Sequence, residues 1–147
     1  MIELQDAAAR HPAEFPFLLV DKVLGAETGE RAIGLRNVTA NDPLLASGGK
    51  ATGLRRSLLI EAFAQLVAIA LAPGDSRPSA VDIARIDSMT FERSPVPGDQ
   101  IVMTVELARP ATGGPLTARC KAEIGGELIS QGTLEVEPAK VGDDEAV

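Results

Sequence analysis

The stretch that decides the fold is residues 57–72, SLLIEAFAQLVAIALA. Its leucine and alanine content favours a helix over a strand, and its length is that of a helix. Apolar residues fall on every side of the helical wheel, which is typical of a buried helix rather than a surface helix. Pro73 and Gly74 follow directly and end the helix. The sequence therefore predicts one central helix that the remainder of the chain must cover.

Upstream of this helix the chain carries two strand-like runs and a loop. Residues 15–26 are rich in strand-forming side chains, and residues 31–39 alternate between apolar and polar, so together they predict a hairpin. Residues 41–56 are broken by Pro43, Gly48, Gly49 and Gly53 and predict a loop. A short N-terminal helix is expected over residues 2–10.

Downstream of the helix, residues 80–91, 100–108, 116–124 and 127–137 read as four strands separated by turn signals. The second of these runs alternates cleanly and places Ile101, Met103, Val105 and Leu107 on one face. The fold class that this order predicts is α+β, with an antiparallel sheet wrapped around one long central helix. Because one curved sheet rarely covers a helix completely, we expect a second copy of the chain to pack beside it.

The composition sets the class of protein. The chain has 147 residues, of which 45% are hydrophobic, so we expect one domain over residues 1–137 and an acidic, disordered tail over residues 138–147. A formal net charge of −7 argues against a nucleic-acid binder and against anionic membrane surfaces. No signal peptide opens the sequence, and its longest apolar run is too short to span a bilayer. We expect a soluble, cytoplasmic protein.

Most familiar catalytic machinery is missing from the sequence. One histidine (His11) and one cysteine (Cys120) are too few for a structural zinc site, so no metal is expected. No glycine-rich nucleotide motif and no G-x-S-x-G elbow occurs, and no cofactor of the chain's own is expected. Cys120 lies in a predicted strand, where it is interpreted as a small core residue.

Ser57, Glu61 and Gln65 form the only polar stripe on the central helix, at spacing i, i+4, i+8. A carboxylate removed from water is costly unless it is paired or protonated. The pattern leaves two interpretations of Glu61 open. It is either a functional acid–base group, or it closes a structural ion pair with Arg85, Arg93 or another basic side chain.

The loop before the helix adds two further candidates. Residues 47–49, Ser-Gly-Gly, offer main-chain N–H groups close to a helix N-terminus, an arrangement that can stabilise a carbonyl oxygen gaining negative charge. An ordinary loop is the alternative. Lys50, Arg55 and Arg56 form a local basic cluster that could dock an acidic or phosphate-bearing partner, and the alternative is a solvated surface.

Several motifs in order resemble the bacterial 3-hydroxyacyl-[acyl-carrier-protein] dehydratases of the hotdog fold. They are FPFLLVDKV at residues 15–23, Asn37-Val38-Thr39 with Asn41-Asp42-Pro43, LIEAFAQ at residues 59–65, Ile86-Asp87, Phe91, Arg93 and VPGD at residues 96–99. The match runs from about Phe15 to Val136. The resemblance implies a hotdog sheet around the helix, and a homodimer or a multiple of it.

The resemblance also implies the chemistry. In that family a histidine of a Gly-His-Phe-Pro-Gly loop is the acid/base, a glutamate on the central helix of the opposite subunit assists it, and the substrates are acyl thioesters on phosphopantetheine. Glu61 matches that glutamate and Gln65 the glutamine after it. The histidine does not carry over: counting from Asn41 gives Gly48, and counting back from Glu61 gives Ser47. Together with the residue pattern, this gives Gly48, Gly49, Ser57 and Gln65 as the candidate substrate-binding residues and Lys50, Arg55 and Arg56 as the candidate carrier-docking residues.

The predicted function is that of a dehydratase-like protein that binds or acts on acyl thioesters, carried on acyl carrier protein or coenzyme A, in fatty-acid or polyketide-type metabolism. One alternative is a non-catalytic subunit that pairs with a histidine-bearing homologue, or a protein that only binds acyl groups or carriers. Another is a Glu61-dependent thioesterase. A full dehydratase with Ser47 or water in place of the histidine ranks lowest, because a serine hydroxyl is a poor acid/base near neutral pH.

Overall fold

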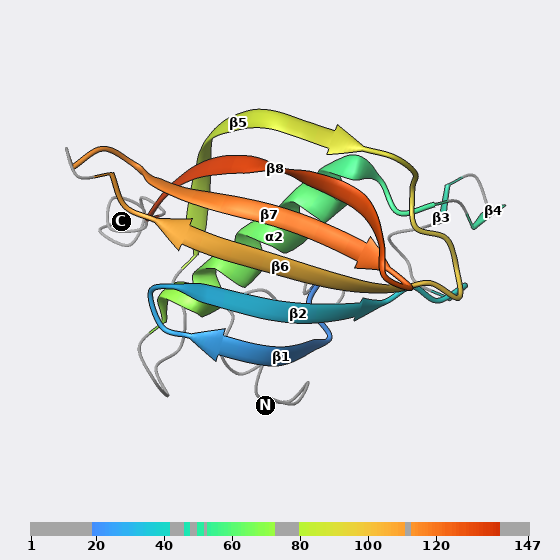
Figure 1. Cartoon of the computed structure of the whole chain (residues 1–147). Helices are drawn as coiled ribbons and strands as arrows, with labels where there is room; N and C mark the ends of the chain where they lie inside the picture. Colours follow the sequence, from blue (N-terminus) through green and yellow to red (C-terminus); the bar gives the residue numbers. More distant parts are fainter. Residues whose placement is uncertain are drawn as a thin grey trace, which may run out of the picture.

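The computed structural model describes residues 19–41, 46–47, 50–51, 53–72, 80–110 and 113–138. The helix expected over residues 2–10 and the first part of the run at 15–26 lie outside these residues. Within them the chain forms one long helix packed against one face of a curved sheet (Figure 1). No helix in this part of the chain is long and apolar enough to cross a membrane.

The main sheet has six strands in the order β1-β2-β6-β7-β8-β5, and every neighbouring pair is antiparallel. The strands are β1 (Lys22–Glu27), β2 (Arg31–Asn37), β5 (Val81–Phe91), β6 (Gln100–Ala108), β7 (Leu116–Ile124) and β8 (Glu127–Pro138). The chain forms the β1–β2 hairpin, enters the helix, and then places β5 beside the last strand rather than beside β6. The strand that follows the helix is therefore an edge strand.

The helix α2 (Arg56–Leu71) fills the concave side of the sheet. Every residue from Ala62 to Ala70 is buried, which confirms the prediction of a helix covered on all sides over that stretch. The helix lies very close to β2, because a Cβ on Gly34 would come within 3.0 Å of the side chains of both Leu66 and Val20. A larger residue at Gly34 would push the helix away from the sheet.

The strands predicted after the helix are confirmed with small shifts at their ends, whereas the run predicted over residues 15–26 becomes a strand only at Lys22 and extends to Glu27. Ile101, Met103 and Val105 are fully buried against the helix, and Leu107 is half-buried, so β6 presents the predicted apolar face to the core. Cys120 is also buried in the core, as interpreted from the sequence. β8 continues to Pro138, one residue into the predicted tail, and the rest of that tail is outside the described residues.

The prediction of a loop throughout residues 41–56 is wrong in two places. Two short strands, β3 (Ala46–Ser47) and β4 (Lys50–Ala51), pair antiparallel with Ser47 opposite Lys50. They flank Gly48-Gly49 in the sequence, and two glycines between short strands are a hairpin signal. Arg56 also belongs to the helix, as its first residue, and not to the loop.

Candidate functional site

The polar stripe on α2 is anchored by a buried glutamine. Gln65 is 2% exposed, and its side-chain oxygen Oε1 accepts a hydrogen bond from the main-chain N–H of Leu19 at 2.7 Å. Leu19 is also buried and lies three residues before β1. This contact fixes the orientation of the amide, because its carbonyl oxygen is occupied and its NH₂ group must point elsewhere. The sequence marked Gln65 but gave no sign of its partner.

The NH₂ group of Gln65 points toward Glu61. Gln65 Nε2 lies 3.5 Å from Glu61 Oε1, a long hydrogen bond one helical turn away. Glu61 itself is exposed, as is Ser57 one turn earlier, whereas the residues that follow Glu61 are buried. The stripe therefore runs from a buried anchor to an exposed carboxylate at the border between the covered and uncovered parts of α2.

The structure corrects two expectations for Glu61. The carboxylate is not withdrawn from water within the single chain, because the first two turns of α2 are only partly covered. The ion pair with Arg85 or Arg93 is not formed either. Arg93 donates to Asp99 at 2.9 Å, and Arg85 lies opposite Glu135 of β8, on the face of the sheet that points away from the helix. In the part of the chain that is described, the only polar contact of the Glu61 side chain is with Gln65.

The start of α2 is held by the turn between β5 and β6. The buried Leu54 donates its main-chain N–H to the carbonyl of Pro95 at 2.7 Å. Gly53 must be small, because a Cβ there would lie 2.8 Å from Cβ of Ser94. Asp99 closes the turn between β5 and β6. Its carboxylate accepts hydrogen bonds from Val96 N at 2.8 Å and from the Arg93 guanidinium at 2.9 Å.

These two contacts, the main-chain bond first, lower the pKa of Asp99 below its usual value of 3.8. The carboxylate therefore stays ionised at neutral pH and keeps the turn closed. Through Pro95 and Leu54, the turn positions the first residues of the helix that carries Glu61.

The N-terminus of α2 is basic. Arg55 is the N-cap residue and makes no side-chain capping hydrogen bond, and the first turn contains no acidic residue. The Arg56 guanidinium lies 5.3 Å from the centroid of the Phe91 ring. Cations at a helix N-terminus add to the positive end of the helix dipole, so an anion would be favoured beside Arg55 and Arg56. Two members of the predicted basic cluster are thus exposed at the end of the helix that bears Glu61.

The remaining candidates lie in the β3–β4 region. Ser47 and Lys50 form one of the two backbone pairs that join the short strands, which lie beyond the N-terminal end of α2 (Figure 1). Gly48 and Gly49 lie outside the described residues. The predictions that Ser47 occupies the position of the family's histidine and that the two glycines hold a thioester carbonyl stay predictions.

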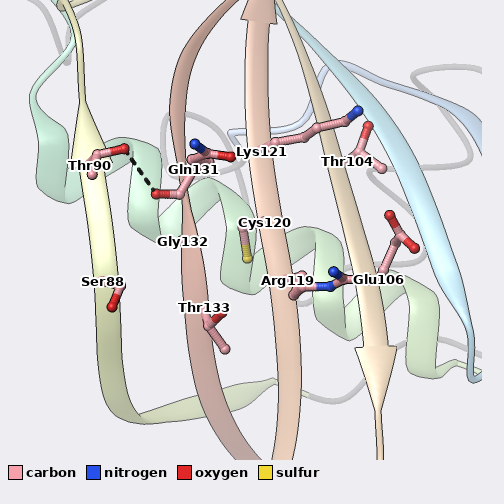
Figure 2. Close-up of a pocket in the computed structure, with 10 residues that line it drawn as sticks. All are labelled: Ser88, Thr90, Thr104, Glu106, Arg119, Cys120, Lys121, Gln131, Gly132 and Thr133. Carbon is pink, nitrogen blue, oxygen red and sulfur yellow. Dashed lines mark hydrogen bonds between the residues drawn. The ribbon is translucent and has the colours of Figure 1, made fainter.

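A second polar region, an open hollow of about 340 Å³, lies on the opposite face of the sheet from the helix (Figure 2). Its walls are polar side chains in cross-strand register, with Arg119 opposite Glu106 and Lys121 opposite Thr104. Cys120 and Gly132 also line the hollow. Burial raises the pKa of the Cys120 thiol to about 12, so the sulfur is protonated and unsuited to nucleophilic attack. The hollow is remote from Glu61, and its opposed charges are typical of a solvated sheet face.

The described residues were also compared with the ligand sets that hold metal ions. No group of three or more His, Cys, Asp and Glu side chains is close enough there to hold a metal ion. The candidate site consists of the Glu61 carboxylate, the buried Gln65 amide and the basic N-terminus of α2.

Comparison with curated proteins identifies relatives whose sequences are similar to that of this chain. The chain is 35% identical over 136 residues to the 3-hydroxyacyl-[acyl-carrier-protein] dehydratase FabZ of Geobacillus thermodenitrificans, covering 91% of this chain and 93% of the relative. It is 38% identical over 133 residues to the protein of the same name from Bacillus cereus, covering 89% and 92%. These alignments span nearly the whole of both chains.

Solved structures with the same fold include more distant proteins. The dehydratase heterocomplex ApeI:P from Xenorhabdus doucetiae superposes with a TM-score of 0.76 at 15% identity, covering 95% of each chain. A hypothetical thioesterase with coenzyme A from Streptococcus pneumoniae superposes with a TM-score of 0.59 at 11% identity, covering 80% of this chain and 84% of the other. Identities this low establish the fold only.

The family model described as a FabA-like domain matches residues 11–133, which includes β1, β2, β5, β6 and β7, the first part of β8, and the helix that carries Glu61. With a six-stranded antiparallel sheet around one central helix, the fold is the predicted hotdog fold. The chain belongs to the FabA-like family of hotdog proteins and is related to the FabZ dehydratases.

Proposed function

We propose that this chain binds acyl thioesters and that Glu61 is the acid–base group that acts on them. The observation that carries the proposal is the geometry of the stripe on α2. Gln65 is buried and fixed by Leu19, and it presents its NH₂ group to a carboxylate that is exposed beside a fully buried helical segment. A carboxylate that is both oriented and accessible can accept a proton from a substrate or from water.

Dehydration of a 3-hydroxyacyl thioester would use this group as follows. A base removes the proton from C2, the hydroxyl leaves C3 with a proton as water, and a double bond forms between C2 and C3. Glu61 can fill one of these two roles, and the second needs another group. The chain's single histidine is His11, which lies outside the described residues. We propose that a second hotdog subunit contributes to the site.

Thioester hydrolysis is the second candidate reaction, because it needs only one acid–base group. Glu61 would take a proton from water as the hydroxide adds to the thioester carbonyl. The carbon–sulfur bond would then break to leave the carboxylic acid, and the departing thiolate would take the proton from Glu61 to leave as a thiol. The main-chain N–H groups near residues 47–49 and at the uncapped start of α2, beside Ser57, would hold the carbonyl oxygen. The observation that favours hydrolysis is that Glu61 is the single carboxylate of the polar stripe on α2.

A binding role without catalysis is the third candidate. In it Glu61 would complete the site of a histidine-bearing partner subunit, or the chain would only hold an acyl group or its carrier. The specific observation for it is that no histidine other than His11 occurs in the sequence.

The carrier of the acyl group is proposed to dock at Lys50, Arg55 and Arg56. The structure leaves Arg55 and Arg56 exposed at the N-terminus of α2, where the helix dipole adds to their charge. An acidic carrier protein, or the phosphate of phosphopantetheine on a carrier or on coenzyme A, would be attracted there. We also propose a cytoplasmic location, since a lone reduced cysteine fits a reducing compartment.

The test is an assay of the purified chain against a 3-hydroxyacyl pantetheine thioester and a saturated acyl pantetheine thioester. Glu61→Gln keeps the size of the side chain and removes its acid–base function, and we expect it to lower turnover by roughly 100-fold or more. The matched control is Glu106→Gln, which changes an exposed carboxylate on the far face of the sheet and should leave turnover unchanged.

The product separates the three candidates. An enoyl product that requires Glu61 identifies a dehydratase, and a free thiol from the saturated substrate identifies a thioesterase. Saturable binding of both thioesters without product identifies the binding role. If Glu61→Gln turns over either thioester at the wild-type rate, the proposal that Glu61 is the acid–base group is wrong.

A further inference from the structure

The end of β5 and the start of α2 meet at the same end of the sheet (Figure 1). There the Arg56 guanidinium lies over the Phe91 ring, 5.3 Å from its centroid. Arg56 is the first residue of the helix, and Phe91 is the last residue of the strand. A cation within about 6 Å of the centre of an aromatic face is attracted by the ring. The contact therefore joins the two elements through their side chains.

Phe91 is itself well anchored to the sheet. It pairs with Ser130 of β8 and packs against the hydrophobic core. The Ser130 hydroxyl donates to the carbonyl of Thr90 at 2.8 Å. Glu92 N donates to the carbonyl of Ile129 at 2.7 Å, and both Ile129 and Ser130 are buried. The ring is thus a fixed point to which the start of the helix can attach.

The first turn of α2 lacks the local devices that usually stabilise a helix start. Its N-cap residue, Arg55, makes no side-chain capping hydrogen bond, and the turn has no acidic residue to favour the helix dipole. Two cations beside the positive end of the dipole oppose helix formation there. Contacts with the end of β5 and the turn after it compensate. Leu54 N bonds to the carbonyl of Pro95 at 2.7 Å just before the helix, and Arg56 lies over its ring within the helix.

Glu61 lies between two contacts that hold its helix. On the C-terminal side, Gln65 accepts a hydrogen bond from Leu19 N at 2.7 Å. On the N-terminal side, Arg56 lies over Phe91. Because Glu61 is exposed, the direction of its carboxylate depends on the order of the helix on both sides. A displacement of about 1 Å at a catalytic group can lower a rate by about 100-fold.

We propose that Arg56 is a positioning residue, which through its contact with Phe91 orders the first turn of α2 and thereby orients Glu61. The proposal rests on the proposed function of Glu61 and distinguishes two members of the basic cluster. In the part of the chain that the structure describes, Arg55 makes no comparable contact with a ring. Arg55 acts by its charge alone, whereas Arg56 also acts on Glu61 through the helix.

Hydrogen exchange of main-chain amides at the start of α2 tests the contact. Leu58 N and Leu59 N both donate to the carbonyl of Arg55, at 3.0 and 3.1 Å, so their exchange reports on the first turn. Arg56→Gln removes the cation, and Phe91→Leu removes the ring but keeps an apolar side chain. We expect either change to lower the protection of these amides roughly two- to fivefold, the effect of losing an exposed cation–π contact.

Arg55→Gln is the matched control for exchange, because it removes the same charge from the same helix end without touching the ring. Loss of a cation there should leave the protection unchanged or raise it, so Arg56→Gln is compared with this variant. The double variant Arg56→Gln/Phe91→Leu should be no less protected than Phe91→Leu, since either change alone breaks the contact. Phe91→Tyr keeps the ring face and should keep the protection.

Turnover separates positioning from docking. The substrate is an acyl pantetheine thioester, which has neither a phosphate nor a carrier protein for the basic cluster to bind. We expect Arg56→Gln and Phe91→Leu to lower kcat by roughly three- to tenfold with KM nearly unchanged, and Phe91→Tyr to recover it. Arg119→Gln removes an exposed arginine on the far face of the sheet and should leave kcat unchanged.

Three results would each overturn the inference: equal protection in Arg56→Gln and Arg55→Gln, additive losses in the double variant, or an unchanged kcat in variants whose first turn is less protected. Failure of the proposed function looks different. If Glu61→Gln turns over the thioesters at the wild-type rate, or the wild type turns over neither, the role of Glu61 is wrong. The exchange of the amides at the start of α2 still decides whether Arg56 holds the helix.

Discussion

At the scale of single residues, Gln65 decides whether the stripe on α2 is ordered. Its Oε1 is the acceptor for the buried N–H of Leu19 at 2.7 Å. Gln65→Met keeps the shape of the side chain but removes this acceptor, which leaves a buried N–H without a partner. We expect the free energy of unfolding to fall by about 1–3 kcal/mol. Urea denaturation followed by circular dichroism measures the change.

The control for this prediction is Ser57→Ala, which alters an exposed member of the same stripe and should change the free energy of unfolding by less than about 0.5 kcal/mol. Equal stabilities of Gln65→Met and the wild type would show that the Leu19 contact does not hold the glutamine. The activity of Gln65→Met then reports separately on the orientation of Glu61.

The same residues show what helical spacing can and cannot predict. The positions Ser57, Glu61 and Gln65 fall on one side of a helix by arithmetic alone, and the structure keeps them there. The contact between Gln65 and Leu19 joins residues 46 positions apart, so only the folded chain brings them together. The exposure of Glu61 likewise depends on how far the sheet extends over the helix.

At the scale of elements, the turn after β5 couples Asp99 to the start of α2. The pKa of Asp99 is lowered in the folded chain by the Val96 N–H and then by Arg93. A group whose folded pKa is depressed contributes stability above its unfolded pKa and loses it as the pH falls through its folded pKa. We therefore expect part of the chain's stability to disappear as the pH drops below about 3.8.

Thermal unfolding of the wild type and of Asp99→Asn between pH 5 and pH 2.5, roughly the range in which carboxylates titrate, tests this coupling. The variant should have a lower Tm at pH 5 and a shallower loss of Tm below pH 4, because it has no carboxylate to protonate. Arg93→Gln keeps the main-chain bond and should lie between the two. Parallel curves for the wild type and Asp99→Asn would contradict the role assigned to the turn.

The positions of the strands and of the helix along the chain were largely predictable from the sequence. Which strands pair with one another in the sheet was not. The apolar alternation of Ile101, Met103 and Val105 placed β6 correctly, because one face of that strand is buried against α2. The pairing of β5 with β8 is a tertiary choice that periodicity does not report. The β3–β4 pair was missed because its strands are two residues long, too short to show any alternation.

At the scale of the whole molecule, positive charge is concentrated at one end of the helix although the chain as a whole is negatively charged. The chain has a formal net charge of −7, yet the helix N-terminus near Glu61 carries Arg55 and Arg56 side by side. An acidic carrier protein would be repelled by most of the surface and attracted at this end, which would deliver the acyl thioester to one place. The net charge follows from the sequence. That Arg55 and Arg56 lie at the start of α2 could be known only once the structure showed where the helix begins.

Arg55→Glu should therefore weaken binding of an acyl-loaded acyl carrier protein by roughly tenfold at low salt, and the difference from the wild type should shrink as salt screens the charges. Arg119→Glu makes the same change in net charge on the opposite side of the sheet and should bind the carrier nearly as the wild type does. Titration of the labelled carrier at two salt concentrations measures both. Equal weakening by the two variants would mean that the carrier responds to net charge alone. Weakening by Arg55→Glu only would place the carrier at the helix that bears Glu61, where the proposed chemistry requires it.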